Sequence, residues 1–202
     1  MSKHSKSLVS LATVVGLAAT FAGCAGPNRA PSSTSAYPMG GGMAAPLGAP
    51  AMAAATAVQV PSGHVVAMET TGTGEIVYEC REKTGAAGSF EWVFVGPTAS
   101  LADRQGRVVG RYFGPPATWA ASDGSAITGA QLAVAPAGDG NLPQQLVKAA
   151  PATGSGMMSG VSYVQRLATR GGVAPSKPCQ MDARGQRQIV QYQADYIFWK
   201  PA

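Results

Sequence analysis

The stretch that decides the fold lies near the C-terminus and reads Gln188-Ile-Val-Gln-Tyr-Gln-Ala-Asp-Tyr-Ile-Phe-Trp199. Every second side chain in it is apolar or aromatic, and glutamine or aspartate fills most of the positions between. A period of two residues is typical of a β-strand with one buried face. We therefore predict a long strand here, with an inner face made of Val190, Tyr192, Ala194, Tyr196 and Phe198.

Shorter segments with the same alternation occur upstream and are separated by glycine and proline. Residues 75–80 place Ile76, Tyr78 and Cys80 on one face, and residues 90–94 repeat the pattern with aromatic side chains. Residues 161–169 form a strong strand candidate. Weaker strands are expected at residues 107–113, 126–134 and 144–149, with a short helix over 142–149 as the alternative to the last of these. No segment keeps a 3.6-residue period over about 12 residues. The sequence therefore predicts one all-β domain, mainly an antiparallel sandwich or a barrel.

Composition agrees with short strands and many turns. The 202 residues include 26 glycines and 15 prolines, and only 12% of the side chains are charged. Coiled coils need far more charged and helix-forming residues and are excluded, and the same composition disfavours a bundle of long helices. The formal charge of +5 includes Lys3 and Lys6, and the balance is +3 without them. The chain has no basic run with interleaved aromatic residues, and we therefore predict no nucleic-acid partner.

Residues 1–23 have the features of a lipoprotein signal peptide. Lys3 and Lys6 precede an uncharged apolar run that is too short to span a bilayer but suits a secretory signal. The run ends in Phe21-Ala-Gly-Cys24, which resembles a bacterial lipobox, in which the cysteine is acylated and becomes the new N-terminus. Ala25 then resembles a signal for the outer membrane, facing the periplasm or the surface. Ordinary cleavage nearby, which would release a soluble secreted protein, is the alternative.

The mature chain divides into two parts of different composition. Residues 24–56 are rich in proline, alanine and glycine and have too few large apolar side chains to offset the entropy of chain ordering. We predict a disordered tether there and a folded domain over residues 57–202. An acylated Cys24 would make the membrane itself a partner, because several acyl chains on one cysteine form a stable anchor.

The cysteine count predicts one disulfide bond. If Cys24 carries lipid, Cys80 and Cys179 remain as an even pair in an oxidising compartment, where pairing is the rule. Because Cys80 shares its predicted face with apolar residues, we expect the bond to be buried and structural. No C-x-x-C or Cys–His spacing is present, and His64 is the one histidine after residue 23. We therefore predict no metal site and no cofactor, and no Ser-His-Asp triad.

Five phrases of the predicted domain, taken in order, point to a known family. They are Gly74-Glu-Ile-Val-Tyr-Glu-Cys80, Trp92 ahead of Gly96-Pro-Thr-Ala-Ser-Leu101, Trp119 before Asp123-Gly-Ser125, Tyr163-Val-Gln-Arg-Leu-Ala-Thr-Arg-Gly-Gly-Val-Ala-Pro175 leading to Cys179, and Ala194-Asp-Tyr-Ile-Phe198. Over roughly residues 57–199 they resemble the exported bacterial and fungal proteins catalogued as domain of unknown function 3455. The resemblance implies secretion, a β-rich domain and a paired cysteine, and it implies no established activity.

This sequence departs from the pattern of the resemblance at two polar positions. Tyr112 stands about where a histidine is expected, and Ala120 stands where a glutamate is expected after Trp119. If the family has a site built from that histidine and glutamate, the resemblance implies that this chain has lost it.

The residues that could bind a ligand gather around one predicted turn. Asp123-Gly-Ser125 follows Trp119, and an aspartate and a hydroxyl beside an indole could hold a sugar or another polar molecule. The alternative is structural, because Asp-Gly is a frequent hairpin pair and tryptophan is a core residue. We take Trp119, Asp123, Ser125, Tyr112 and Arg166 as the candidate ligand-binding residues, with a small molecule or glycan as the ligand.

Arg166 lies in the middle of a predicted strand and needs a partner. A buried guanidinium is stable only when it is paired, and we predict a structural salt bridge with Asp195 of the last strand. An anion-binding role is the alternative. Paired carboxylates such as Glu79 and Glu91 could instead support glycoside hydrolysis. The sequence therefore favours a lipid-anchored envelope protein with a non-catalytic binding or structural module, and a carbohydrate-directed envelope hydrolase is the alternative.

Overall fold

The computed structural model describes residues 57–202, and they form an all-β domain, as the alternation predicts. Eight strands follow one another, and one short 3-10 helix, η1 (Met181–Ala183), precedes the last of them. The strands are β1 (His64–Glu82), β2 (Phe90–Ala102), β3 (Val108–Phe113), β4 (Thr118–Ala121), β5 (Ala126–Ala135), β6 (Gln144–Ala149), β7 (Tyr163–Gly171) and β8 (Arg187–Pro201).

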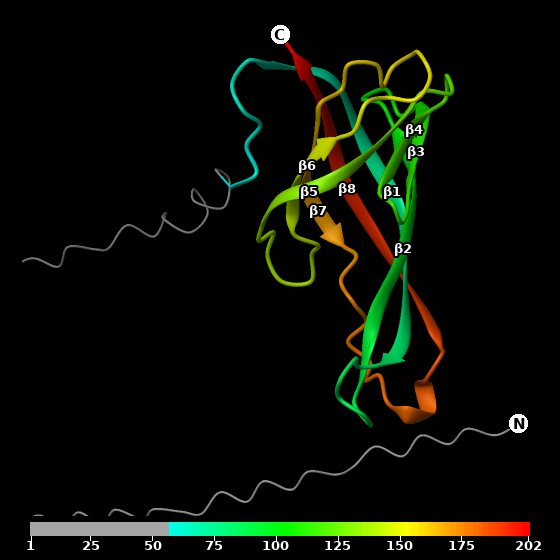
Figure 1. The fold of residues 1–202 in the computed structure, drawn as a ribbon. Coiled ribbons are helices and arrows are strands. Elements are labelled where there is room, and N and C mark those ends of the chain that lie inside the picture. Colours follow the sequence, from blue (N-terminus) through cyan, green and yellow to red (C-terminus); the bar gives the residue numbers. More distant parts are fainter. Residues whose placement is uncertain (1–56) are drawn as a thin grey trace, which may run out of the picture. The chain divides into compact units, whose positions relative to one another are not determined.

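The sheet closes into a barrel. Each strand pairs antiparallel with the next along the chain, and β8 pairs antiparallel with β1. Figure 1 shows the last strand, in red, lying beside the first, in cyan. Of the two predicted architectures, this is the barrel. An up-and-down order lets every connection be a local turn or loop, because antiparallel neighbours need no crossover.

The core fills the barrel, and the inner face predicted for β8 is confirmed. Tyr192, Ala194, Tyr196 and Phe198 are buried, whereas Ile189 near the start of the strand is 58% exposed. Gly72 of β1 lies against the ring of Tyr196, where a Cβ atom would clash with the ring carbons. A glycine is therefore required at this position because the ring and the backbone approach closely.

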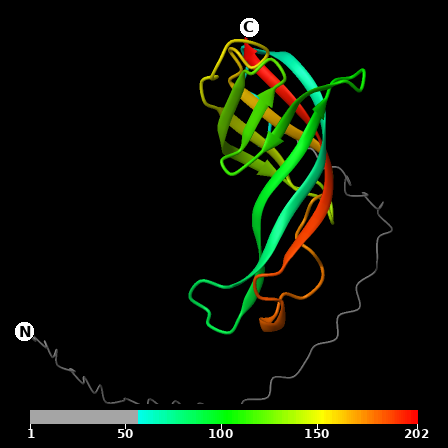
Figure 2. The same ribbon diagram turned by 90° about the vertical axis from the view of Figure 1, so that its right-hand side faces the viewer.

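Three strands continue beyond the barrel as a twisted extension (Figures 1 and 2). β2 pairs with β3 only from Thr98 onward, and β8 pairs with β7 only as far as Tyr192. The extension therefore consists of the C-terminal half of β1, residues 90–97 of β2 and the start of β8. Its inner face is covered by the segment between β7 and β8.

A disulfide bond fastens that covering segment, as the cysteine count predicts. Cys80 of β1 and Cys179 are bonded, with their Cα atoms 5.5 Å apart and 99 positions apart in sequence. Cys80 is fully buried, which agrees with the structural role expected from its face. Trp92, directly opposite Cys80 on β2, donates its indole N–H to the Lys177 carbonyl at 2.7 Å. The bond and this hydrogen bond together hold the segment on the extension.

Two local predictions differ from the structure. β4 was not expected, because only Trp119 among its residues is large and apolar. The alternative helix over residues 142–149 is wrong, because Gln144–Ala149 is the strand β6. Leu146 of β6 faces outward and is nevertheless buried, since Val58 packs over it in a second small cluster. Burial on both faces hides the period of two that identifies most strands.

Several predictions concern residues outside the described part of the chain. The signal peptide over 1–23, the tether over 24–56 and the acylated Cys24 all lie there. Within residues 57–202, no helix has the length and apolar character needed to cross a membrane.

Candidate functional site

Four tyrosines and one arginine occupy inward-facing positions of the barrel and of the adjoining extension, and we call them the tyrosine–arginine cluster. They are Tyr78 of β1, Tyr112 of β3, Arg166 of β7, and Tyr192 and Tyr196 of β8. The registers explain why they meet. Arg166 lies directly opposite Tyr196, whose buried ring defines the inner face, and Tyr112 lies directly opposite buried Trp119. Side chains opposite each other in an antiparallel pair share one face of the sheet.

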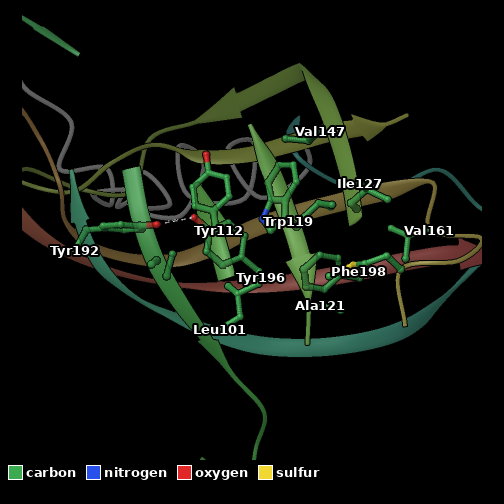
Figure 3. Close-up of a cluster of buried hydrophobic side chains, with 14 of the residues drawn as sticks. Leu101, Tyr112, Trp119, Ala121, Ile127, Val147, Val161, Tyr192, Tyr196 and Phe198 are labelled. Carbon is green, nitrogen blue, oxygen red and sulfur yellow. Dashed lines mark hydrogen bonds between the residues drawn. The ribbon is translucent and has the colours of Figure 1, made fainter. Parts of the chain in front are cut away.

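The aromatic members pack closely (Figure 3). The rings of Tyr112 and Trp119 are stacked, with centroids 4.9 Å apart, and the Tyr196 ring lies 5.2 Å from Tyr112. The hydroxyls of Tyr192 and Tyr196 are 3.3 Å apart, so one donates to the other. The Tyr78 hydroxyl donates to the Gly172 carbonyl at 2.8 Å. These contacts place the phenols in one group near the end of the barrel that carries the extension.

Arg166 is held at the rim of this group by the loop before β6. Its Nε and Nη2 atoms donate to the Pro143 carbonyl at 3.3 and 2.9 Å. The loop is fixed to β7 in turn, because Thr169 donates to the Leu142 carbonyl and the Gly171 amide donates to Asn141. Arg166 is therefore positioned by several hydrogen bonds rather than left free in solvent.

The predicted salt bridge between Arg166 and Asp195 is wrong. Asp195 lies opposite Leu167, one residue along β7, and successive residues of a strand point to opposite faces. The arginine therefore points inward and the aspartate points outward. Asp195 accepts a hydrogen bond from the Thr71 hydroxyl at 3.1 Å instead.

The phenols of the cluster are neutral hydrogen-bonding groups. Burial raises the pKa of Tyr192 to about 12, and it raises the pKa of Tyr196 well above the ordinary value. Burial also raises the pKa of Tyr112, while the positive charge of Arg166 lowers it. The charge of Arg166 also lowers the pKa of Tyr78, Tyr192 and Tyr196, against the larger effect of burial. One cation thus lies within electrostatic reach of all four hydroxyls.

Trp119 contributes the most unusual polar atom in the barrel. The residue is only 1% exposed, and within residues 57–202 its Nε1–H has no hydrogen-bond acceptor. A buried donor without a partner costs roughly 1–3 kcal/mol relative to a satisfied one. Most buried polar groups in proteins are hydrogen-bonded, so an orphan of this kind calls for an explanation. A bound molecule that supplies an acceptor is one.

Asp123 and Ser125 do not join the cluster. The Asp123 carboxylate accepts hydrogen bonds from the Ser125 hydroxyl at 2.6 Å, the Ser125 amide at 2.9 Å and the Met157 amide at 2.7 Å. The Ser125 hydroxyl accepts one from the Met158 amide at 3.1 Å. Both side chains therefore connect the β4–β5 turn to the loop before β7. Asp123 and Ser125 thus have the structural role that the sequence offered as the alternative to ligand binding.

We expect Asp123 to make the fold sensitive to acid. The Ser125 hydroxyl, followed by the Met157 and Ser125 amides, lowers the pKa of this carboxyl group. Its stabilising effect is therefore present above the ordinary aspartate pKa of about 4 and is lost as pH falls through the lower folded-state value. Asp123→Ala should flatten the fall in melting temperature between pH 6 and pH 3.

The matched control for this measurement is Asp139→Ala, in the exposed loop between β5 and β6. Its melting temperature should follow the wild-type curve over the same pH range. An Asp123→Ala protein that loses as much thermal stability on acidification as the wild type would contradict the role given to this carboxylate.

The carboxylates considered for hydrolysis are engaged in ion pairs on the outside. Glu79 is bonded to Arg81 and Arg187 at 2.8 and 2.9 Å, and hydrogen bonds from these two arginines lower its pKa. Glu91 lies opposite Arg81 and 3.8 Å from Lys83. A glycosidase acid needs a raised pKa to stay protonated. The two arginines beside Glu79 lower its pKa instead, so they favour the ionised form.

Sequence reasoning missed a depression on the outer face of β1 and β8. It has a volume of about 250 Å³ and is lined by Glu69, Thr71, Arg104, Asp195 and two neighbours. The two carboxylates meet because Glu69 and Asp195 are diagonal neighbours across the β1–β8 pair. Both already have partners, since Arg104 forms an ion pair with Glu69 and Thr71 donates to Asp195. Only a knowledge of the register could have brought these residues together.

The part of the chain that the structure describes has no group of three or more metal-ligating side chains. His64 lies near the start of β1, at the end of the barrel opposite the extension. Its Nδ1 is 3.0 Å from the Pro61 carbonyl, and its ring meets Tyr163 edge-on at 4.9 Å. These contacts fix the start of β1, and neither of them brings a carboxylate or a hydroxyl nucleophile to the histidine.

Comparison with known proteins gives one result. The family described as Protein of unknown function (DUF3455) matches residues 61–200. The chain belongs to this family. No curated protein and no solved structure matches it.

The DUF3455 resemblance placed a histidine at Tyr112 and a glutamate at Ala120. Tyr112 is opposite Trp119 and points inward, whereas Ala120 is opposite Arg111 and lies on the outer face. In this chain the sheet separates side chains at these two positions. The positions of Tyr112 and Ala120 therefore cannot form one catalytic pair in this chain.

Proposed function

We propose that this chain is a lipid-anchored cell-envelope protein whose barrel is a non-catalytic module that binds a small molecule. The observation that carries the proposal is the Trp119 Nε1–H, buried in the barrel beside Tyr112 without an acceptor among residues 57–202. Arg166 adds an inward-pointing charge at the same group. Because buried polar groups are normally hydrogen-bonded, a ligand that supplies an acceptor would satisfy the Trp119 donor.

The arrangement of the acids supports binding rather than catalysis. Glu79 and Asp123 are held by hydrogen bonds that lower their pKa values, and neither points into the barrel. A general acid and a nucleophile facing each other across a cleft would require the opposite environment for one of the two. The tyrosine–arginine cluster contains no carboxylate and no histidine to transfer a proton.

A thermal-shift screen of the full chain tests the binding proposal. Glycans, haem, divalent metals, phospholipids and small organic acids serve as probes, and we expect one class to raise the melting temperature. Trp119→Phe keeps an aromatic core residue but removes the N–H, so it should reduce that shift. Trp92→Phe is the matched control, because its N–H is satisfied by Lys177 in the extension. A full panel without any shift would reject the binding module.

The anchor is tested separately by mass spectrometry of the protein from its native membrane. We expect the N-terminal peptide to begin at Cys24 and to carry acyl chains. The disulfide bond supports export, because such bonds persist in oxidising compartments. A mature protein that begins elsewhere, or carries an unmodified Cys24, would remove the lipid anchor from the proposal and leave the secreted alternative.

A further inference from the structure

From the tyrosine–arginine cluster we infer that the molecule bound there is a small carboxylate with an apolar body. This inference rests on the proposed binding function and names its ligand class. It starts from the charge of the cluster. Within residues 57–202, Arg166 forms none of the ion pairs, which involve Arg81, Lys83, Arg104, Arg107 and Arg187 instead.

No carboxylate of the described chain neutralises Arg166 from inside. Glu69, Glu75, Glu79 and Asp195 occupy outward positions on β1 and β8, since their neighbours Thr70, Ile76, Tyr78 and Tyr196 are buried. The remaining acids lie on the outer face of the extension, at its tip, or in turns and loops. An arginine in a mainly aromatic environment is stabilised by an anionic partner. Arg166 is half-buried, and an anion that pairs with it has to come from outside the described chain.

The geometry of the guanidinium favours a carboxylate. Nε and Nη2 both donate to the Pro143 carbonyl, which occupies the side edge of the group. The end edge, formed by Nη1 and the second hydrogen of Nη2, remains available. Two parallel N–H bonds on one edge match the two oxygens of a carboxylate. A loop carbonyl thus fixes the arginine and leaves the face that recognises carboxylates free.

The neighbouring groups add donors and no anionic acceptor. Within residues 57–202 the Tyr112 hydroxyl has no hydrogen-bond partner, and the Tyr192–Tyr196 pair uses one of its two hydroxyl protons. Trp119 supplies the orphan N–H. A donor-rich group selects a ligand oxygen that carries negative charge, because hydrogen bonds to ions are about twice as strong as neutral ones.

Aromatic side chains beside the donors account for the apolar body. Tyr78 lies within electrostatic reach of Arg166, and its ring meets Phe94 edge-on with centroids 6.0 Å apart. Phe94 is 48% exposed. An exposed aromatic ring next to the cluster favours a ligand that carries an apolar body of its own. A bare inorganic anion would leave the surface in water.

Three probes of the same shape test the inference by calorimetry on the full chain. Phenylacetate carries the carboxylate, phenylacetamide replaces it with a neutral amide, and benzylphosphonate replaces it with a larger oxyanion. We expect phenylacetate to bind at least roughly tenfold more tightly than either. Arg166→Gln should weaken phenylacetate binding by about 10- to 100-fold, the range for hydrogen bonds to charged groups. Arg111→Gln, with its guanidinium over Phe113 on the outer face, is the matched control and should bind as the wild type does.

Each outcome decides one question. Equal binding of phenylacetate and phenylacetamide would overturn the carboxylate assignment and leave the binding module intact. Tighter binding of benzylphosphonate would indicate a phosphate-like ligand group and would also overturn the carboxylate assignment. Tyr112→Phe and Arg166→Lys give a second measurement should Arg166→Gln not fold, and an undiminished affinity in both would overturn the site. Failure of every compound in the wider thermal-shift panel would instead overturn the proposed function.

Discussion

Replacing Cys80 and Cys179 together by alanine should lower the free energy of unfolding by about 2–5 kcal/mol. The bond joins positions 99 residues apart, so it restricts the unfolded chain over most of the domain. In the folded state it also holds the segment that covers the inner face of the extension. Both effects act in the same direction, because the double variant gains freedom when unfolded and loses packing when folded. Urea denaturation of the full chain, followed by circular dichroism, measures the difference.

Two comparisons make this measurement specific. The wild-type protein with its disulfide reduced should unfold at the urea concentration of the double variant. Met181→Ala, in the same segment and 63% exposed, should unfold as the wild type does. A loss below about 1 kcal/mol in the double variant would contradict the structural role given to the bond, since removing a native disulfide from a small exported domain costs more.

Phe198→Ala should destabilise the barrel by about 3–5 kcal/mol. The side chain is fully buried on β8 and belongs to the core cluster with Val147, Val161 and Val164. Truncation to alanine removes its burial from water and leaves a space that rigid sheet neighbours cannot fill. Its position opposite Val164 in the register means that the space opens within the barrel. Equilibrium unfolding in urea again gives the value.

Ile189→Ala is the control on the same strand. Ile189 is 58% exposed and nine residues from Phe198, an odd number that places it on the outer face. We expect a change within about 0.5 kcal/mol, as for most surface substitutions. Similar losses in the two variants would mean that the faces of β8 are assigned wrongly, and the barrel core with them.

The sequence was most informative where packing follows the strand period. The inner face of β8 could be read directly, because Gln191, Gln193 and Asp195 separate its apolar residues. The inner face of the first half of β1 could not be read in this way, because Thr70-Thr71-Gly72-Thr73-Gly74 does not alternate between apolar and polar side chains. Its glycine at 72 is explained by the ring of Tyr196, more than a hundred residues away. Single-sequence patterns do not contain such distant contacts.

In the candidate site, too, some contacts could be predicted from the sequence and others depend on residues far away in the chain. Of the candidate ligand-binding residues, the fold stacks Tyr112 on Trp119 and places Arg166 within electrostatic reach of Tyr112, whereas Asp123 and Ser125 serve a turn. The loop amide that bonds to the Asp123 carboxylate belongs to Met157, 34 residues further along the chain. The error over Asp195 depended on the register, because only the pairing of Arg166 with Tyr196 shows that Arg166 and Asp195 lie on opposite faces of the sheet.

Closure of the sheet determines where another polypeptide could add a strand. A closed barrel offers no row of unpaired backbone N–H and C=O groups, so edge-to-edge association has no starting point there. The extension differs, because residues 90–97 of β2 and the first residues of β8 have a strand on one side only. Glu91 and Arg187 stand on those two borders. Charged side chains at an exposed strand edge oppose pairing with the same edge of another copy, so they protect the extension from edge-to-edge aggregation.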